Sequence, residues 1–249
     1  MRIFSVVLGA GVLITAFGTV RTVFPKHPEL ALMTSAFIAF IPQHLAMTAG
    51  VNNDTLAELV VGCTLWALVG YAGEWRDRPS DSATRWLRPW QQPWGVGLLL
   101  GAALLTKTTA YVVAGVAVGA VLLRGHREKR RWPWMASQLA WMIVPALLVS
   151  APWFIRNGLT YGWRDPLGLA QHKAVVQGQP RSYEWLADYG WVGLGRRLVF
   201  TTFQSFWGQF GWMAVPMPRR VYQVLAVMTL ILVGGFVIWL GHRRGSYID

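Results

Sequence analysis

Three polar residues in a row, Asn52, Asn53 and Asp54, interrupt long apolar stretches in the sequence AGVNNDTLAE. Neighbouring amide and carboxylate groups suit hydrogen bonding to a polar ligand, and a carboxylate also suits general acid–base chemistry. The same letters fit a helix start, because Thr55 and Glu58 have the spacing of a capping box and Asp54 is an alternative cap. Both interpretations stay open for Asp54, but a capping box does not account for Asn52 and Asn53.

Four further polar residues lie at the ends of apolar stretches, where their side chains suit a charged ligand. His44 lies in FIPQHLAM, Lys107 is an isolated cation in LLTKTT, and Arg156 and Asn157 follow Trp153 in PWFIRNG. Arg and Lys bind phosphate oxygens, and a Trp ring offers a face to a sugar or a prenyl chain. The structural alternatives are a histidine satisfied at the interface, a snorkelling lysine and an interfacial Trp–Arg anchor.

Metal and cofactor chemistry have little support in the sequence. The single cysteine, Cys63, excludes an internal disulfide and a cysteine-based metal site. No cluster of metal-ligand residues is present, so we assign no metal ligands and identify no cofactor. A divalent metal is compatible with the chemistry discussed below, but no residue pattern favours one.

The composition is that of a membrane protein. Of 249 residues, 54% are hydrophobic, only 14% are charged, and fifteen are tryptophans. Soluble domains carry about a quarter charged residues, and tryptophans collect where spans meet the membrane interface. The net charge of +12 comes from basic residues placed between apolar runs, which favours lipid contacts and topology signals over nucleic acid as a partner.

We therefore predict an all-α, polytopic helical bundle that forms a single membrane domain over residues 1–249. It has about seven spans and a long outer segment at 154–220. The predicted spans are approximately 3–20, 30–47, 56–71, 95–106, 110–123, 135–153 and 221–240. The fourth and fifth are short for a span of about 20 residues, so residues 95–123 are either one long helix or two.

The basic residues favour two helices. With seven spans and Met1 outside, thirteen basic residues fall in inner loops against two, Arg2 and Lys107, outside the long outer segment. The thirteen are Arg21, Lys26, Arg76, Arg78, Arg85, Arg88, Arg124, Arg127, Lys129, Arg130, Arg131, Arg243 and Arg244. An N-terminus outside without a leader leads us to expect that one more helix precedes Met1.

An ordered set of stretches resembles the GT-C superfamily of membrane glycosyltransferases, in its protein-mannosyltransferase and aminoarabinose-transferase-like branch, and the related bacterial membrane family DUF2142. The stretches are RIFSVVLGAGVLITAFGTVRTVFP, AFIPQHLAMTAGVNNDTL, GLLLGAALLTKTTAYVV, PWFIRNGLTYG and SFWGQFGW. The resemblance implies sugar transfer from a polyprenyl-phosphate-linked donor to an extracytoplasmic acceptor. It also implies an integral protein of the bacterial inner membrane with its active face outside.

The likeness departs from the superfamily at one point. Superfamily members carry the catalytic acid in the first outer loop, and this sequence begins at the span that follows it. The resemblance therefore implies a supporting role for Asp54. It leaves Asn52, Asn53, His44, Lys107, Arg156 and Asn157 as substrate-binding candidates. The alternative function is a non-catalytic transporter of lipid-linked sugars or a subunit that assembles envelope glycans.

Overall fold

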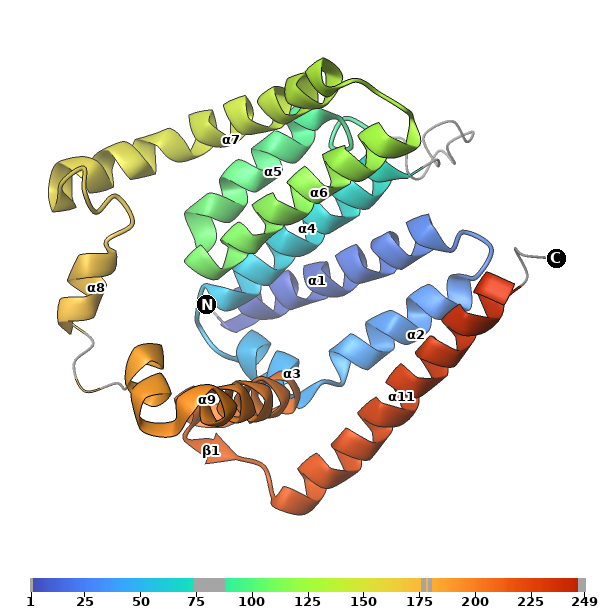
Figure 1. The fold of residues 1–249 in the computed structure, drawn as a ribbon, viewed down its shortest axis with the longest axis vertical. Helices are drawn as coiled ribbons and strands as arrows, with labels where there is room; N and C mark the ends of the chain where they lie inside the picture. Colours follow the sequence, from blue (N-terminus) through green and yellow to red (C-terminus); the bar gives the residue numbers. More distant parts are fainter. Residues whose placement is uncertain (1, 74–87, 176–177, 179–180, 246–249) are drawn as a thin grey trace. The chain divides into compact units, whose positions relative to one another are not determined.

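The computed structural model describes residues 2–73, 88–175, 178 and 181–245 of the chain. Almost all of its elements are helices (Figure 1). In chain order they are α1 Arg2–Val23, α2 Pro28–Ala39, α3 Pro42–Ala49, α4 Asp54–Ala72, α5 Pro93–Thr106, the 3-10 turn η3 Thr108–Tyr111, α6 Val112–Arg127, α7 Trp132–Tyr161, α8 Leu169–Val175, α9 Ser182–Trp207, α10 Phe210–Met213, β1 Val215–Pro216 and α11 Arg219–Gly245.

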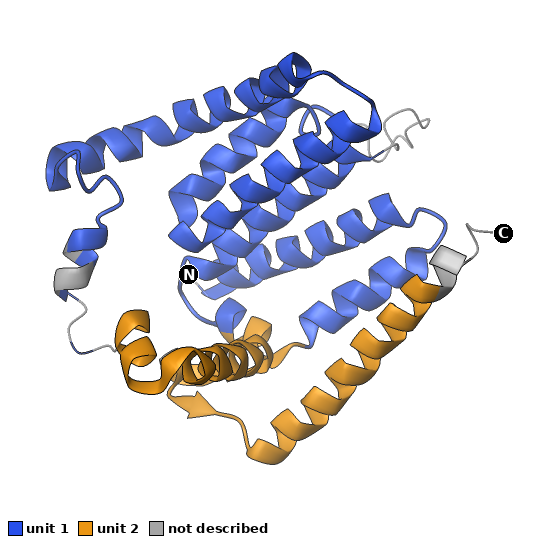
Figure 2. Ribbon diagram, viewed as in Figure 1, with its two compact units in different colours: residues 1–40, 47–179 blue, residues 41–46, 180–249 orange. Residues whose placement is uncertain are grey.

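The chain divides into two compact units (Figure 2). Met1–Phe40 and Met47–Gln179 make the first unit, and Ile41–Ala46 and Pro180–Asp249 make the second. The boundary runs through α3, so the residues of that helix are shared between the units. The single membrane domain predicted over residues 1–249 contains both units. That this whole range forms one domain stays a prediction.

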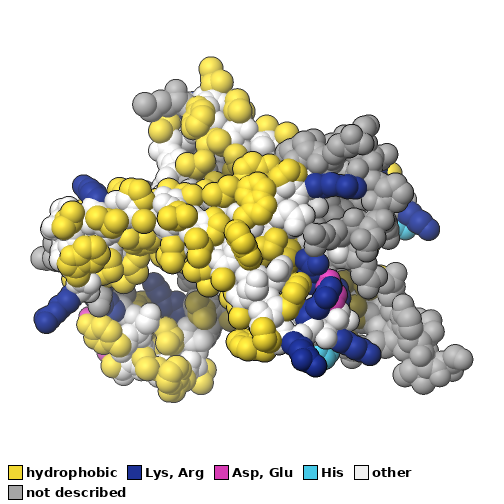
Figure 3. All heavy atoms as spheres, turned by 90° about the horizontal axis from the view of Figure 1, so that it is seen from above, with side chains coloured by type: hydrophobic (Ala, Val, Ile, Leu, Met, Phe, Trp, Pro, Cys, Tyr) yellow, Lys and Arg dark blue, Asp and Glu magenta, His cyan; other side chains and the backbone are white. Residues whose placement is uncertain are grey.

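Five of the described helical segments are long and apolar enough to cross a membrane. These segments are α1, α4, α7, residues 108–127 and residues 219–241. The bent pair of α2 and α3 makes a sixth if it counts as one span. The predicted helical membrane protein is thus confirmed, whereas seven spans and the outer segment 154–220 stay predictions. Hydrophobic side chains also cover much of the face shown in Figure 3, as a lipid-facing surface requires.

Residues 95–123 form two helices. Helix α5 ends at Thr106, Lys107 has an extended backbone (φ −158°, ψ 144°), and η3 leads into α6. At about 1.5 Å per residue, the 14 residues of α5 extend roughly 21 Å, less than the ~30 Å of a bilayer core. The split favoured by the basic-residue count is therefore present. Three of the residues in that count, Arg76, Arg78 and Arg85, lie outside the described residues.

The core of the first unit forms where α5 packs along α7, with α4 and α6 beside them (Figure 1). Gly97 and Gly101 lie one turn apart on α5 and let the two backbones approach closely. A Cβ atom at Gly97 would overlap the carbonyl oxygen of Met142, and one at Gly101 would lie 2.9 Å from that of Ala146. This close packing holds α5 against α7, and Lys107 follows the last residue of α5.

In the first unit, α1 lies against α4 (Figure 1). Gly18 of α1 makes room for the Trp66 ring, since a Cβ atom there would overlap it. The indole N–H of Trp66 donates a hydrogen bond to the Thr22 hydroxyl at 3.0 Å. These contacts hold α4 against α1, and the first residue of α4 is Asp54.

The second unit is held together around a turn after α9. The Tyr222 hydroxyl donates to the Gly208 carbonyl at 2.7 Å and accepts from the Met217 N–H at 3.0 Å. The side chain of Gln43 accepts from the Gln209 N–H at 3.0 Å, which connects residues 41–46 to this unit.

Candidate functional site

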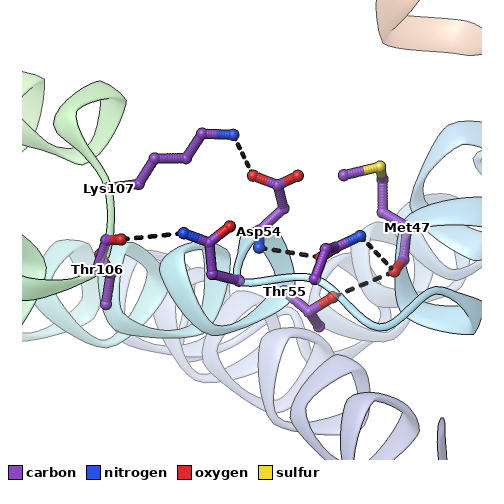
Figure 4. Close-up of polar contacts among 7 residues, drawn as sticks. Met47, Asp54, Thr55, Thr106 and Lys107 are labelled. Atoms are coloured by element: carbon purple, nitrogen blue, oxygen red, sulfur yellow. Dashed lines mark hydrogen bonds and ion pairs between the residues drawn. The ribbon is translucent and has the colours of Figure 1, made fainter. Parts of the chain in front are cut away.

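A polar cluster lies where α4 begins and α5 ends, in the first unit (Figure 4). We define the polar cluster as Met47, Asn52, Asn53, Asp54, Thr55, Thr106 and Lys107. The sequence predicted four of these residues as site candidates, namely Asn52, Asn53, Asp54 and Lys107, and the structure brings these four together.

Asp54 and Lys107 form an ion pair between the carboxylate and the ammonium group. The two side chains are 24% and 39% exposed, respectively, so the pair lies at the edge of the unit and is accessible to a ligand. Asp54 occupies the first turn of α4, where unpaired N–H groups favour a negative charge. Lys107 belongs to the break between α5 and η3, and its extended backbone separates it from both helices.

The two asparagines have structural partners. The side-chain oxygen of Asn52 accepts from the Asp54 N–H at 3.0 Å, and its amide donates to the Met47 carbonyl at 3.4 Å. The amide of Asn53 donates to the Thr106 carbonyl at 3.2 Å, next to Lys107. Both side chains are exposed, so these bonds hold the loop while leaving the amides open to solvent.

The capping box predicted for Thr55 and Glu58 is wrong. Helix α4 begins at Asp54, and its N-cap, Asn53, makes no side-chain capping bond. Thr55 is fully buried inside the helix, and its hydroxyl donates to the Met47 carbonyl at 3.4 Å. Asn52 satisfies the Asp54 N–H instead, in the manner of an Asx turn.

Arg156 and Asn157 lie on the last turns of α7, which continues to Tyr161, beyond the predicted end at residue 153. Asn157 is 4% exposed and donates to the Pro166 carbonyl at 3.1 Å, so it fixes the turn that follows the helix. Arg156 is exposed, donates to the Asn157 side-chain oxygen at 3.1 Å, and lies 5.3 Å over the Trp153 ring.

His44 is half-buried in α3, in the part of that helix that belongs to the second unit. The polar cluster as defined above does not include it. Within the part of the chain that the structure describes, no three His, Cys, Asp or Glu side chains are grouped as a metal site.

Sequence reasoning missed the two carbonyl groups that anchor the polar cluster, those of Met47 and Thr106. Every residue carries a backbone carbonyl, so no residue type signals this role. The isolated Lys107 between threonines was the available signal that α5 breaks here.

The polar cluster combines a cation, a carboxylate and two amides on residues that packed helices hold in place. An ammonium group at such a position can bind a phosphate or another anion by exchanging its carboxylate partner. The amides add donors and acceptors suited to hydroxyl groups.

The comparisons with known proteins give a family. A family model described as "Predicted membrane protein (DUF2142)" matches residues 1–248. A comparison with curated proteins found no match, and neither did a comparison with solved structures. The chain belongs to the DUF2142 family of membrane proteins.

Proposed function

We propose that this member of the DUF2142 family is a glycosyltransferase of the GT-C type. It transfers a sugar from a polyprenyl-phosphate-linked donor to an acceptor on the extracytoplasmic face of the bacterial inner membrane. The observation that carries the proposal is the ion pair of Lys107 with Asp54 at a break between helices.

The reaction needs a cation at the leaving group. The acceptor hydroxyl attacks the sugar, a carboxylate base takes its proton, and the bond from the sugar to the lipid phosphate breaks. Charge builds up on the departing phosphate, and a fixed cation there lowers the barrier. Lys107 fits this role because its ammonium group is held by a neighbouring carboxylate and its side chain is 39% exposed.

Asp54 has a supporting role in this proposal. Its carboxylate holds the Lys107 ammonium group in the free protein and gives it up when the donor phosphate binds. Asn52 and Asn53 keep the loop in position through Met47 and Thr106, and their exposed amides face polar groups of the substrate.

Arg156 is the second candidate for phosphate binding. Its guanidinium group is exposed beside the Trp153 ring, and the side-chain oxygen of Asn157 accepts a hydrogen bond from one of its N–H groups. A guanidinium group held on one side retains N–H groups for a phosphate, and the indole face suits a prenyl chain or a sugar. His44 remains a substrate-binding candidate on its residue type, a ring that can donate or accept a hydrogen bond.

A carrier of lipid-linked sugars is the second candidate function. It is favoured by the same ion pair, because the one carboxylate of the polar cluster is already engaged with Lys107. A carrier needs to bind the lipid phosphate but has no need of a base.

The test uses the full-length protein in vesicles made from an envelope extract, which supplies the acceptor hydroxyl, with a radiolabelled polyprenyl-phosphate sugar as donor. A transferase releases polyprenyl phosphate, and we expect Lys107→Met to slow the release by about a hundredfold or more. Lys26→Met is the matched control, because Lys26 is an exposed lysine in the turn after α1. Donor binding without release identifies a carrier, and the absence of donor binding contradicts both functions.

A further inference from the structure

A second polar site lies at the other end of α6 from Lys107, within the first unit. A pocket of about 430 Å³ opens between the start of α5, the end of α6 and the first turns of α7. Its walls include two arginines and three tryptophans. These residues are Arg124, Arg130, Trp94, Trp134 and Trp141. The 16 residues of α6 separate the pocket from the polar cluster by roughly 24 Å at about 1.5 Å per residue.

Arg124 is the most enclosed charge of the pocket. Its side chain is 11% exposed, and its guanidinium carbon lies 4.6 Å from the centre of the Tyr71 ring. Its Nε–H donates to Glu128 at 2.7 Å. Among the described residues, its buried Nη1 group has no hydrogen-bond partner. A buried guanidinium N–H without an acceptor is unfavourable, so an acceptor in the pocket would complete it.

A tight turn after α6 brings Arg130 into the same pocket as Arg124. Lys129 has a positive φ of 51°, and the Arg130 N–H donates to the Gly125 carbonyl at 2.8 Å. This turn brings the Arg130 Nε–H to Glu128 at 2.9 Å. One carboxylate thus bridges two guanidinium groups, which leaves the group of three side chains with an excess positive charge.

The tryptophans indicate the environment of the ligand. Trp94 and Trp141 are 42% and 61% exposed, respectively, although they line a pocket. Partly exposed tryptophans are typical of the membrane interface, where one end of the ring is apolar and the other is wet. A ligand bound here therefore meets both fixed positive charge and lipid-like surface.

We propose that this pocket binds the headgroup phosphate of an anionic phospholipid. Arginine forks match phosphate oxygens in a bidentate way, and basic pockets between membrane helices bind lipid headgroups. The unpaired Arg124 Nη1 and the Arg130 guanidinium donate to the phosphate, while Trp94 and Trp141 contact the glycerol and the first acyl carbons. The proposal is independent of sugar transfer, because none of its residues belongs to the polar cluster.

The experiment measures phospholipid binding to the full-length protein by native mass spectrometry after release from detergent micelles. Phosphatidylglycerol is compared with phosphatidylcholine, and inorganic phosphate and glycerol 3-phosphate serve as soluble probes. The main variant is Arg130→Gln, because that side chain is 52% exposed and its loss is compatible with folding. Arg124→Gln is the second variant. Arg127→Gln, an exposed arginine of the same turn that does not line the pocket, is the matched control.

We expect phosphatidylglycerol to bind at least about tenfold more tightly than phosphatidylcholine, because the two arginines repel the positive choline group, whereas the glycerol headgroup is uncharged. Arg130→Gln lowers the ratio of the two affinities about tenfold. Arg130→Lys retains part of the preference, because the positive charge stays but the bidentate guanidinium group is lost. Arg127→Gln leaves the preference unchanged. Equal binding of the two lipids overturns the proposal, as does an equal loss in the Arg127 control. Displacement of the lipid by millimolar glycerol 3-phosphate would identify a soluble phosphate ligand and also overturn it.

Discussion

Lys107 and Asp54 form an ion pair although 53 residues separate them in the sequence. The pair joins the first turn of α4 to the break between α5 and η3. The neighbouring bond from Asn53 to the Thr106 carbonyl connects the same two segments. Charge and backbone contacts therefore act together, so that Lys107 is fixed in the free protein and remains exposed to a ligand.

Asp54→Asn tests whether Asp54 only holds the Lys107 ammonium group or also contacts the donor. Because the carboxylate occupies Lys107 in the free protein, its removal should strengthen donor binding by about twofold to fivefold, the equivalent of a partly exposed ion pair of up to about 1 kcal/mol. The Asn52 bond to the backbone N–H of residue 54 is unaffected, so the fold should persist. Titration of the labelled donor into vesicles measures the affinity. Weaker binding in the variant would mean that Asp54 itself contacts the donor.

Arg156→Ala and Asn157→Ala test two neighbouring side chains with different roles. The exposed Arg156 should matter for the donor, whose affinity should fall by about tenfold while the free energy of unfolding changes little. Asn157 is 4% exposed, and its loss leaves the Pro166 carbonyl without its donor. We expect Asn157→Ala to lower the free energy of unfolding by about 1–3 kcal/mol. Donor titration and thermal unfolding in detergent measure both effects, and unchanged donor affinity in Arg156→Ala contradicts its phosphate role.

Apolar run lengths were sufficient to predict where most helices lie, because a long apolar run in a membrane protein has few alternatives to a helix. The break at Lys107 was also predictable. Two helices over residues 95–123 place the basic residues after α6 on the same inner side as the other basic loops, whereas one long helix does not. The end of α7 was not. Polar residues such as Arg156 and Asn157 are compatible with both a helix and a loop, and Asn157 finds its partner, Pro166, only after the chain turns back.

For the polar cluster and the pocket, the sequence likewise predicted residue types better than contacts. The residue types predicted Asn52, Asn53, Asp54 and Lys107, but the capping box was wrong because Asn52 satisfies the helix start from two residues upstream. The pocket around Arg124 was missed, although the spacing of Arg124 and Glu128 is that of a helical ion pair. Its stacking on Tyr71 and its unpaired Nη1 depend on packing between helices, which residue spacing does not encode.

Gly97→Ala tests the close contact between α5 and α7. The added methyl group would overlap the Met142 carbonyl oxygen, and the helices would have to separate. We expect a loss of about 1–3 kcal/mol in the free energy of unfolding. Gly115→Ala on α6 is the matched control, because a Cβ atom there meets nothing within 4 Å. It should be neutral or stabilising by up to about 1 kcal/mol. Equal destabilisation by both variants, measured by denaturant unfolding, would contradict the role of the contact.

Glu128 should make stability depend on pH. The hydrogen bond from Arg124 holds the pKa of the Glu128 carboxyl below its ordinary value of 4.5, and the bond from Arg130 acts in the same direction against the effect of burial. A lowered pKa in the folded state means that the stabilisation is fully present above the unfolded-state value of 4.5 and is lost as the pH falls through the folded-state pKa.

The test compares Glu128→Gln with the wild-type protein. At about pH 7 the variant should unfold at a lower temperature, because two guanidinium groups lose their shared carboxylate. As the pH falls below 4.5 and through the folded-state pKa, the difference should shrink, since the wild-type carboxyl then becomes protonated. Thermal unfolding followed by circular dichroism in a non-ionic detergent gives both midpoints. A difference that stays constant over this range would show that the carboxylate charge does not stabilise the turn between α6 and α7.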